Sequence, residues 1–294
     1  MIQGICPASC GELLQGYMLG GEKLISYSIN LFSTVTIIEK TQVDKNSISQ
    51  NHEKAYRMLE SLFRHYGYHK EDYKDIVLKI DSPIPIGKGM ASSTADLAAT
   101  AVAGAKYLKK TITQEEIAKL CIAIEPTDST IFSHLTLFDH LKGTFKKQYH
   151  SLPACKVLLL EGKEIIDTIS FRKTDRRSLL KKAEASLGEA LSLFEKGIKA
   201  RDLKEIGKAA TISAFANQSI LHKEDLEEIH ELSQRLGAYG INVAHSGSVM
   251  GVLYNDGDFD REGFYHGLLE KKLMKNYLSI SSYDIISGGA RLAN

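Results

Sequence analysis

One stretch, residues 76–109, limits most strongly what this chain can fold into. It begins with the apolar run IVLKID at 76–81, which is typical of a buried strand. From Thr94 onward it is rich in Ala and Leu and ends in Lys residues, which suits a helix and its macrodipole. The sequence therefore predicts a strand, a tight turn and a helix in direct succession.

The turn combines prolines, glycines and a lysine, and small hydroxyl residues open the helix: Pro83, Pro85, Gly87, Lys88, Gly89, Ala91, Ser92, Ser93 and Thr94. One hydroxyl would be enough for an ordinary helix cap. Two glycines and three hydroxyls beside a helix N-terminus instead favour backbone N–H groups that bind a phosphate. We expect Lys88 to add a mobile positive charge to this loop.

Two common phosphate loops do not fit this stretch. A Walker A loop requires Gly where Ser82 stands and Ser or Thr where Gly89 stands. The dinucleotide fingerprint G-x-G-x-x-G has Ser92 in place of its third glycine.

The stretch instead resembles the phosphate loop of the GHMP small-molecule kinases, P-x-x-x-G-[LM]-[GA]-S-S-[AT]-A. The resemblance implies that the chain binds ATP, and it implies a set of ATP-binding residues: Pro85, Ile86, Gly87, Lys88, Gly89, Met90, Ala91, Ser92, Ser93, Thr94 and Ala95.

The segment CPASCGELLQG near the N-terminus resembles the first motif of the same family, P-G-[KR]-x-x-[LF]-x-G-E. Pro7, Gly11 and Glu12 fit it, whereas Ser9 lies near the place of the usual basic residue. The resemblance makes Ser9 and Glu12 candidates for the substrate pocket, with Glu12 facing a substrate ammonium group. A plain glycine-rich turn in a sheet is the alternative.

Acidic residues gather in IEPTDSTIFSHLTLFDH at 124–140, where Glu125 and Asp128 are three residues apart. In phosphoryl transfer one carboxylate can hold Mg²⁺ while another orients or deprotonates the attacking hydroxyl. Turn formation around Pro126 is the alternative. The family resemblance implies that Glu125, with Ser93, binds Mg²⁺ and that Asp128 is catalytic.

The histidines of this segment receive a plainer interpretation. We interpret His134 and His140, like the neighbouring Asp139, as residues of the surface or the core edge.

A third pattern, GINVAHSGSVMGVLYNDG at 240–257, predicts two strands joined by a glycine-containing turn. It resembles the third family motif, which supports the phosphate loop and faces the substrate, so Ser246 and Gly247 become candidate substrate-binding residues. For His245 a structural role that fixes the loop is favoured over a role as proton carrier.

The remaining pattern predicts the frame around these motifs. Short strands broken by glycines are expected over 3–38, and a strand is expected at 156–161. Amphipathic helices are predicted by apolar periodicity and by one capping box, Thr113 with Glu116. Their ranges are 51–67, 114–124, 175–197, 201–217 and 223–236.

Length and composition set outer limits. A chain of 294 residues favours two domains, and we place the division near residue 150: 1–150 as an N-terminal ATP-binding domain and 151–294 as a C-terminal domain. The net charge of +1 argues against a nucleic-acid or anionic-membrane partner. No apolar run is long enough to cross a membrane, and the N-terminus lacks the pattern of a leader peptide, so we expect a cytoplasmic protein. In that compartment its cysteines are expected to be free thiols. A homodimer is left open.

The resemblance also implies a fold and a reaction. It implies an α+β protein with an N-terminal domain like the second domain of ribosomal protein S5 and a ferredoxin-like C-terminal domain. The residues of three motifs resemble one branch of the family most: CPASCGELLQG, EPTDST and NVAHSGSVMG. That branch phosphorylates the side-chain hydroxyl of L-threonine, and its product serves the synthesis of the aminopropanol side chain of cobalamin.

Three other interpretations are weighed against this one. The first keeps the fold and changes the acceptor alcohol to homoserine or mevalonate. The second is a non-catalytic nucleotide-binding homologue, against which the presence of both Glu125 and Asp128 argues. A serine hydrolase is disfavoured, because no G-x-S-x-G elbow occurs.

Overall fold

A computed structural model describes residues 1–40, 52–166 and 176–293, and every strand pairing within them is antiparallel. The α+β class is thereby confirmed. The strands are β1 (Ile2–Met18), β2 (Gly21–Glu39), β3 (Ile76–Asp81), β4 (Thr136–Phe138), β5 (Lys146–Gln148), β6 (Lys156–Gly162), β7 (Gly240–Val243), β8 (Val249–Tyr254), β9 (Tyr277–Ile286) and β10 (Arg291–Leu292). They form one sheet in the order β10-β1-β7-β8-β6-β9-β2-β4-β5, with β3 paired to β2.

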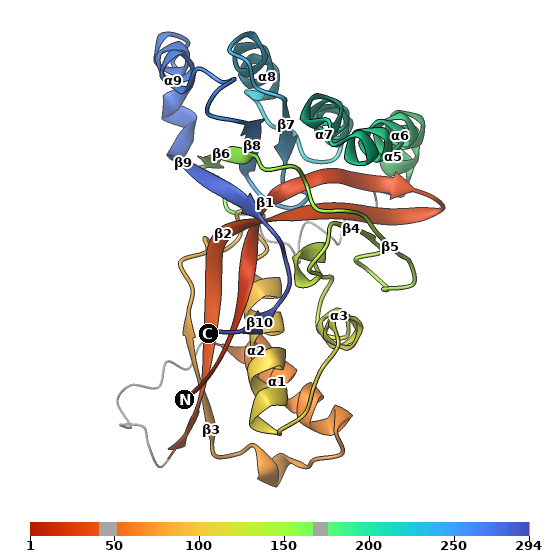
Figure 1. The fold of residues 1–294 in the computed structure, drawn as a ribbon, viewed down its shortest axis with the longest axis vertical. Coiled ribbons are helices and arrows are strands. Elements are labelled where there is room, and N and C mark those ends of the chain that lie inside the picture. Colours follow the sequence, from red (N-terminus) through yellow and green to blue (C-terminus); the bar gives the residue numbers. More distant parts are fainter. Residues whose placement is uncertain (41–51, 167–175, 294) are drawn as a thin grey trace.

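Helices cover this sheet in two groups (Figure 1). In the lower half of the view lie α1 (Glu53–His65), α2 (Ser92–Tyr107) and α3 (Gln114–Ile122). In the upper half lie α5 (Arg177–Lys182), α6 (Glu184–Ala200), α7 (Leu203–Asn217), α8 (Leu226–Arg235) and α9 (Arg261–Glu270). Short 3₁₀ turns occupy Lys70–Asp72, Ser129–Ile131 and Met274–Asn276.

Most of the predicted helices and strands are present, with ends shifted by a few residues. The predicted helix at 175–197 is divided into α5 and α6, and residue 175 lies outside the described residues. In α1 the predicted apolar face is the buried one: Ala55, Met58, Leu59, Leu62 and Phe63. The Thr113–Glu116 capping box opens α3 as expected.

The prediction of several short strands over residues 3–38 is wrong. Two long strands, β1 and β2, form one hairpin that turns at Leu19 and Gly20. Gly11 lies within β1, where its φ of +68° goes with register shifts between Pro7 and Leu14. Such bulges bend a strand without ending it. The hairpin can therefore run from the lower half of the molecule into the upper half (Figure 1).

Helix α2 lies against β1 and β2 at the centre of the lower half. Its sequence is small and apolar nearly all round, and its residues from Thr94 to Ala105 are buried apart from Asp96. A helix with this pattern must be enclosed on all sides to be stable. The enclosure fixes the position of its N-terminus, which faces the junction of the two halves.

A second group of buried apolar residues lies in the upper half, where α8 and α9 pack on β6, β7 and β8. The sheet continues across the predicted division at residue 150, because β9 lies between β6 and β2. Strand β1 also pairs with both β7 and β10. The assignment of 1–150 and 151–294 as separate domains stays a prediction.

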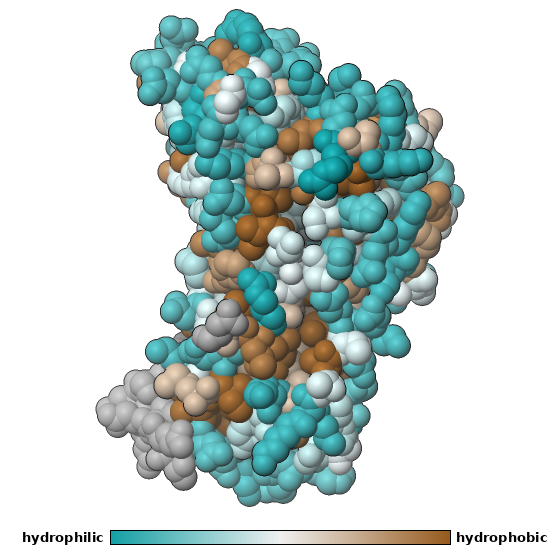
Figure 2. Space-filling model, viewed as in Figure 1, coloured by the Kyte–Doolittle hydropathy of each residue, from teal (hydrophilic) through white to brown (hydrophobic). Residues whose placement is uncertain are grey.

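Hydrophilic residues dominate the outline of the molecule, and hydrophobic residues gather along the middle of the face shown in Figure 2. Within the described residues no helix is both long and apolar enough to span a bilayer. The four cysteines are free, as predicted, and all four are buried.

Candidate active site

The loop before α2 has the backbone geometry of a phosphate-binding turn. Gly87 and Gly89 have φ angles of +73° and +81°, in the region that favours glycine. Ala91 is also left-handed, with a φ of 59°, although it carries a side chain. The first N–H groups of α2 are left without a side-chain cap, because Ala91 is the N-cap residue.

The hydroxyls at the start of α2 bind acidic side chains instead of capping the helix. Ser93 Oγ donates to Oε1 of Glu125, and Thr94 Oγ1 donates to Oδ2 of Asp128 at 3.3 Å. Thr94 Oγ1 also accepts a hydrogen bond from the Asp128 N–H at 3.2 Å. The ordinary-cap interpretation of these hydroxyls is therefore wrong.

A cavity of about 310 Å³ opens over the N-terminus of α2. It brings together parts of the chain that are far apart in sequence: Leu24, Lys54, Ile86, Gly87, Gly89, Met90, Ala91, Ser92, Ser93, Thr94, Glu125, Pro126, Asp128, His140, Ile165, Ile166, His245 and Ser246. Eight of the predicted ATP-binding residues, both acidic residues and Ser246 are in this set.

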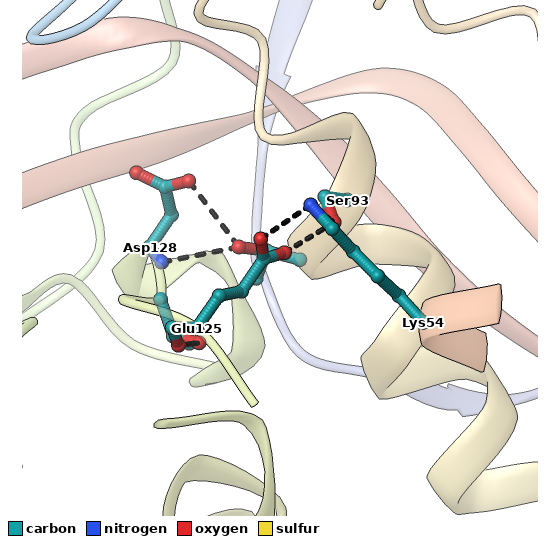
Figure 3. A network of polar contacts seen from close by, with 6 residues as sticks. Lys54, Ser93, Glu125 and Asp128 are labelled. Atoms are coloured by element: carbon teal, nitrogen blue, oxygen red, sulfur yellow. Dashed lines mark hydrogen bonds and ion pairs between the residues drawn. The ribbon is translucent and has the colours of Figure 1, made fainter. Parts of the chain in front are cut away.

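Lys54 is a member of the site that the sequence did not indicate. It lies in the first turn of α1, and its Nζ is 2.6 Å from Oε2 of Glu125 and 3.4 Å from Oγ of Ser93 (Figure 3). An ammonium group thus lies where one hydroxyl and one carboxylate converge. The position attracts a cation, although an ion pair this exposed contributes little to stability.

Glu12 lies behind Asp128 and contacts its carboxyl group. Burial raises the pKa of the Glu12 carboxyl well above its usual range, and the charge of Asp128 acts in the same direction. A hydrogen bond links the two carboxyl groups. Two adjacent carboxyl groups cannot both ionise easily, and the burial of Glu12 favours its carboxyl as the one that keeps a proton.

Glu12 and Ser9, predicted for the substrate pocket, are not among the residues that line this cavity, and their assignment to substrate binding stays a prediction. Glu12 is 3% exposed, and its Oε2 accepts a hydrogen bond from the His245 N–H at 2.6 Å. Ser9 is fully buried, and its N–H donates to the Met90 carbonyl at 3.1 Å. Both residues belong to β1, which supports the phosphate loop and Asp128 from beneath.

The expectation of a mobile charge at Lys88 is wrong. Its side chain is buried, and its Nζ donates to the carbonyls of Gly162, Lys163 and Glu164 at 2.7, 3.0 and 2.9 Å. An ammonium group has three donors, and all three are used here. Lys88 therefore joins the phosphate loop to the end of β6. Pro85 and Ala95 likewise lie outside the cavity lining.

The turn after β7 packs directly against the phosphate loop. A Cβ atom on Gly247 would lie 2.1 Å from the Lys88 carbonyl oxygen, so only glycine fits there. Lys223 donates to the Gly247 carbonyl at 2.5 Å, and burial lowers the pKa of Lys223 to about 8. Gly247 thus supports the loop, while the neighbouring Ser246 lines the cavity.

Two histidines for which the sequence favoured structural or surface positions lie in the cavity wall. His140 is 3% exposed, and its ring centroid is 5.1 Å from that of His245. The interpretation of His140 as a surface or core-edge residue missed its place in the cavity lining. Its position follows from β4, whose pairing with β2 no local pattern could indicate.

Two exposed apolar side chains lie at the same cavity. Ile86 is 81% exposed and Ile165 is 74% exposed, and both are in its lining. Backbone contact holds their segments together, since the Ile166 N–H donates to the Gly87 carbonyl at 3.0 Å. Apolar side chains of this kind suit the flat face of a heteroaromatic ring.

Comparisons with known proteins agree with this geometry. The family model described as GHMP kinases N terminal domain matches residues 53–136, and GHMP kinases C terminal matches residues 194–262. An L-threonine kinase of Citrobacter freundii is 37% identical over 98% of both chains. An L-threonine kinase of Salmonella typhimurium is 36% identical over 98% of this chain and 94% of its own.

Similarity to solved structures extends over the same length. The mevalonate kinase of Methanococcus jannaschii superposes with a TM-score of 0.67 over 99% of this chain and 98% of its own. At 18% identity this similarity concerns the fold.

Proposed function

The chain belongs to the GHMP kinases, and we propose that it transfers the γ-phosphoryl group of ATP to the side-chain hydroxyl of L-threonine, giving O-phospho-L-threonine and ADP. The acceptor is proposed because the two relatives that match nearly the full length are L-threonine kinases. The residues of the three motifs resemble the same branch of the family. The product would then be used to make the aminopropanol side chain of cobalamin.

One observation supports this proposal most directly. Glu125 and Asp128 reach the same cavity as the uncapped N-terminus of α2, and both are held by hydroxyls of its first turn. A helix N-terminus with glycines before it favours the phosphates of a nucleotide. Two acids at that point supply the other two requirements of phosphoryl transfer, a cation ligand and a group for the acceptor hydroxyl.

The nucleotide would bind with its phosphates against backbone N–H groups of the loop between Gly87 and Ser93. Ile86 and Ile165, exposed at the cavity, would contact the adenine. Lys88 would take part through its backbone alone, since its ammonium group is occupied by three carbonyls.

The donor set at Ser93 and Glu125 fits Mg²⁺. A hydroxyl and a carboxylate are hard oxygen ligands, and a cationic group, Lys54 Nζ, already approaches both of them. When bound, Mg²⁺ would neutralise charge on the phosphate oxygens. Lys54 would then exchange its contact with Glu125 for one with a phosphate.

Asp128 would receive the proton of the acceptor. The threonine hydroxyl oxygen forms a bond to the γ-phosphorus while the bond from that phosphorus to the leaving oxygen of ADP breaks. The hydroxyl proton passes to the carboxylate of Asp128. Because burial favours Glu12 as the carboxyl that keeps a proton, Asp128 would stay ionised and available as the base.

An acceptor panel tests this proposal. Purified enzyme with ATP and Mg²⁺ is assayed for ADP release with L-threonine, L-serine, L-homoserine and mevalonate, and the phosphorylated product is identified by mass spectrometry. We expect the highest kcat/KM with L-threonine. A clear preference for homoserine or mevalonate would refute the acceptor, and a lack of turnover with every alcohol would refute the kinase.

A further inference from the structure

Three side chains outside the phosphate loop converge beside the cavity, and two of them, His140 and His245, line it. A carboxylate oxygen of Glu22 and ring nitrogens of His140 and His245 all lie within 4.8 Å of one another. The site proposed for Mg²⁺ offers oxygen ligands alone, whereas this cluster offers two imidazoles and one carboxylate. Its chemistry is therefore of a different kind and requires its own explanation.

The sheet brings the segments that carry two of these side chains together. Leu24 of β2 pairs with Phe138 of β4 in antiparallel register. Glu22 precedes Leu24 by two residues in β2, and His140 follows Phe138 by two residues, in the turn just beyond the end of β4. The pairing of β2 with β4 therefore holds the segments of Glu22 and His140 close to each other.

The third side chain arrives from the other half of the molecule. His245 follows the end of β7, and its N–H is held by Oε2 of Glu12 at 2.6 Å. The rings of His140 and His245 are inclined at 59° with centroids 5.1 Å apart. Nε2 of His140 and Nδ1 of His245 are shielded from solvent. Two ring nitrogens thus lie near a carboxylate in a partly enclosed place.

We propose that Glu22, His140 and His245 bind one divalent cation of the Zn²⁺ type, with a coordination position left open toward the cavity. Imidazole nitrogens with one carboxylate oxygen suit Zn²⁺ and its first-row neighbours, whereas Mg²⁺ prefers oxygen alone. Three protein ligands leave room for a water or a substrate group. Both histidines are in the cavity lining, so the open position would lie next to the cavity.

The ion would connect three segments around the cavity: the start of β2, the residues after β4 and the turn after β7. The His140 carbonyl accepts a hydrogen bond from the Thr127 N–H at 3.0 Å, directly before Asp128. A metal bound at His140 would therefore also restrain the segment that carries Asp128. The site does not depend on which alcohol the enzyme phosphorylates.

Direct binding measurements test this site without relying on activity. Untagged full-length protein is treated with a chelator, dialysed and titrated with Zn²⁺ by calorimetry and with Co²⁺ by visible absorption. We expect one ion per chain, a Co²⁺ spectrum typical of nitrogen ligation, and a higher midpoint of thermal unfolding with Zn²⁺. Mg²⁺ in excess should not displace the Zn²⁺.

Variants identify the ligands. Zn²⁺ binding should weaken by at least about tenfold in each of the variants Glu22→Gln, His140→Gln and His245→Ala. Replacing a residue that only hydrogen-bonds to a metal ligand already lowers metal affinity by about that factor. Glu22→Gln preserves shape at a half-buried position, so its fold should survive even if a histidine variant unfolds. Two controls, His266→Ala on the exposed face of α9 and Glu125→Gln, should leave Zn²⁺ binding unchanged.

The outcomes separate the alternatives. If neither Zn²⁺ nor Co²⁺ binds at one per chain, or if Glu22→Gln binds Zn²⁺ as tightly as the wild type, the cluster is a histidine–carboxylate contact without a metal and the proposal is overturned. Loss of the Co²⁺ spectrum in Glu22→Gln, with the spectrum retained in the two controls, supports it.

Discussion

Thr94 and Asp128 are joined by two hydrogen bonds in opposite directions. The Thr94 hydroxyl donates to the Asp128 carboxylate at 3.3 Å and accepts from the Asp128 backbone N–H at 3.2 Å. One side chain at the start of α2 thus fixes both the backbone and the carboxylate of the proposed base. Because α2 is enclosed between the sheet and the helices α1 and α3, the position of Asp128 is set by the core of the lower half.

Replacing Thr94 by Val removes both hydrogen bonds and keeps the side-chain shape. We expect kcat to fall by about ten- to a hundredfold, because a hydrogen bond to a charged group contributes roughly 1.5–3 kcal/mol. Steady-state kinetics check this, with ATP affinity measured separately. Thr100→Val on the same helix removes only a bond to the Asp96 carbonyl and should keep normal turnover.

Replacing Asp128 by Asn should lower kcat by about 10²–10⁴-fold, since a positioned general base contributes that much. The amide keeps the size of the side chain, so nucleotide binding, measured by calorimetry with a non-hydrolysable analogue, should survive. Asp81→Asn at the exposed end of β3 is the matched control. Near-normal turnover in Asp128→Asn would remove this residue from the mechanism.

Gly247→Ala should damage the phosphate loop. The added methyl group would lie 2.1 Å from the Lys88 carbonyl oxygen, so backbone must shift. We expect at least about 1 kcal/mol of lost stability together with a higher KM for ATP. Gly188→Ala in α6, where nothing lies within 4 Å of the new methyl, should instead stabilise the protein by about 0.5–1 kcal/mol. Denaturant unfolding compares the two.

Local patterns predicted the elements around the site well. The strand, the glycine turn and the Ala-rich helix at 76–109 are each determined by residues close in sequence, and the structure contains all three. The buried face of α1 follows from the same helical periodicity. Glu125 and Asp128 could be singled out because their spacing to each other is local.

Contacts between distant segments could not be predicted in this way. Lys54 has no pattern of its own in the sequence, and it reaches Glu125 only because α1 packs beside α2. Lys88 lies among phosphate-loop residues, yet the nearby end of β6 supplies carbonyls that bind its ammonium group. Glu12 matches a motif position, but the bulged path of β1 sets it behind Asp128 rather than in the cavity lining.

Glu125 and Lys54 should affect the metal requirement in opposite directions. Glu125→Gln removes a proposed Mg²⁺ ligand, so the Mg²⁺ concentration for half-maximal rate should rise by at least about tenfold. Lys54→Met removes the ammonium group that competes for the same carboxylate, so that concentration should fall. Mg²⁺ titrations at saturating ATP measure both. A rise in Lys54→Met would contradict competition and assign Lys54 to the phosphates alone.

Glu12→Gln should change how stability depends on pH. The pKa of the Glu12 carboxyl is raised above its ordinary value of 4.5 in the folded state, mainly by burial. Below the ordinary value both states keep the proton. As pH rises toward the folded pKa, the unfolded state releases a proton that the folded state retains, so stability falls. Glutamine carries no such proton and can still donate to Asp128.

The free energy of unfolding of Glu12→Gln, relative to the wild type, should therefore increase with pH. Urea unfolding of both proteins at about pH 5 and about pH 8 gives the difference in unfolding free energy at each pH. The dependence of that free energy on urea concentration must be the same in the two proteins for the comparison to hold. The Gln variant should also retain more turnover than Glu12→Ala, because it preserves the donor that faces Asp128. A difference in unfolding free energy that stays constant with pH would mean that the Glu12–Asp128 pair keeps no extra proton in the folded protein, and the raised pKa of Glu12 would be refuted.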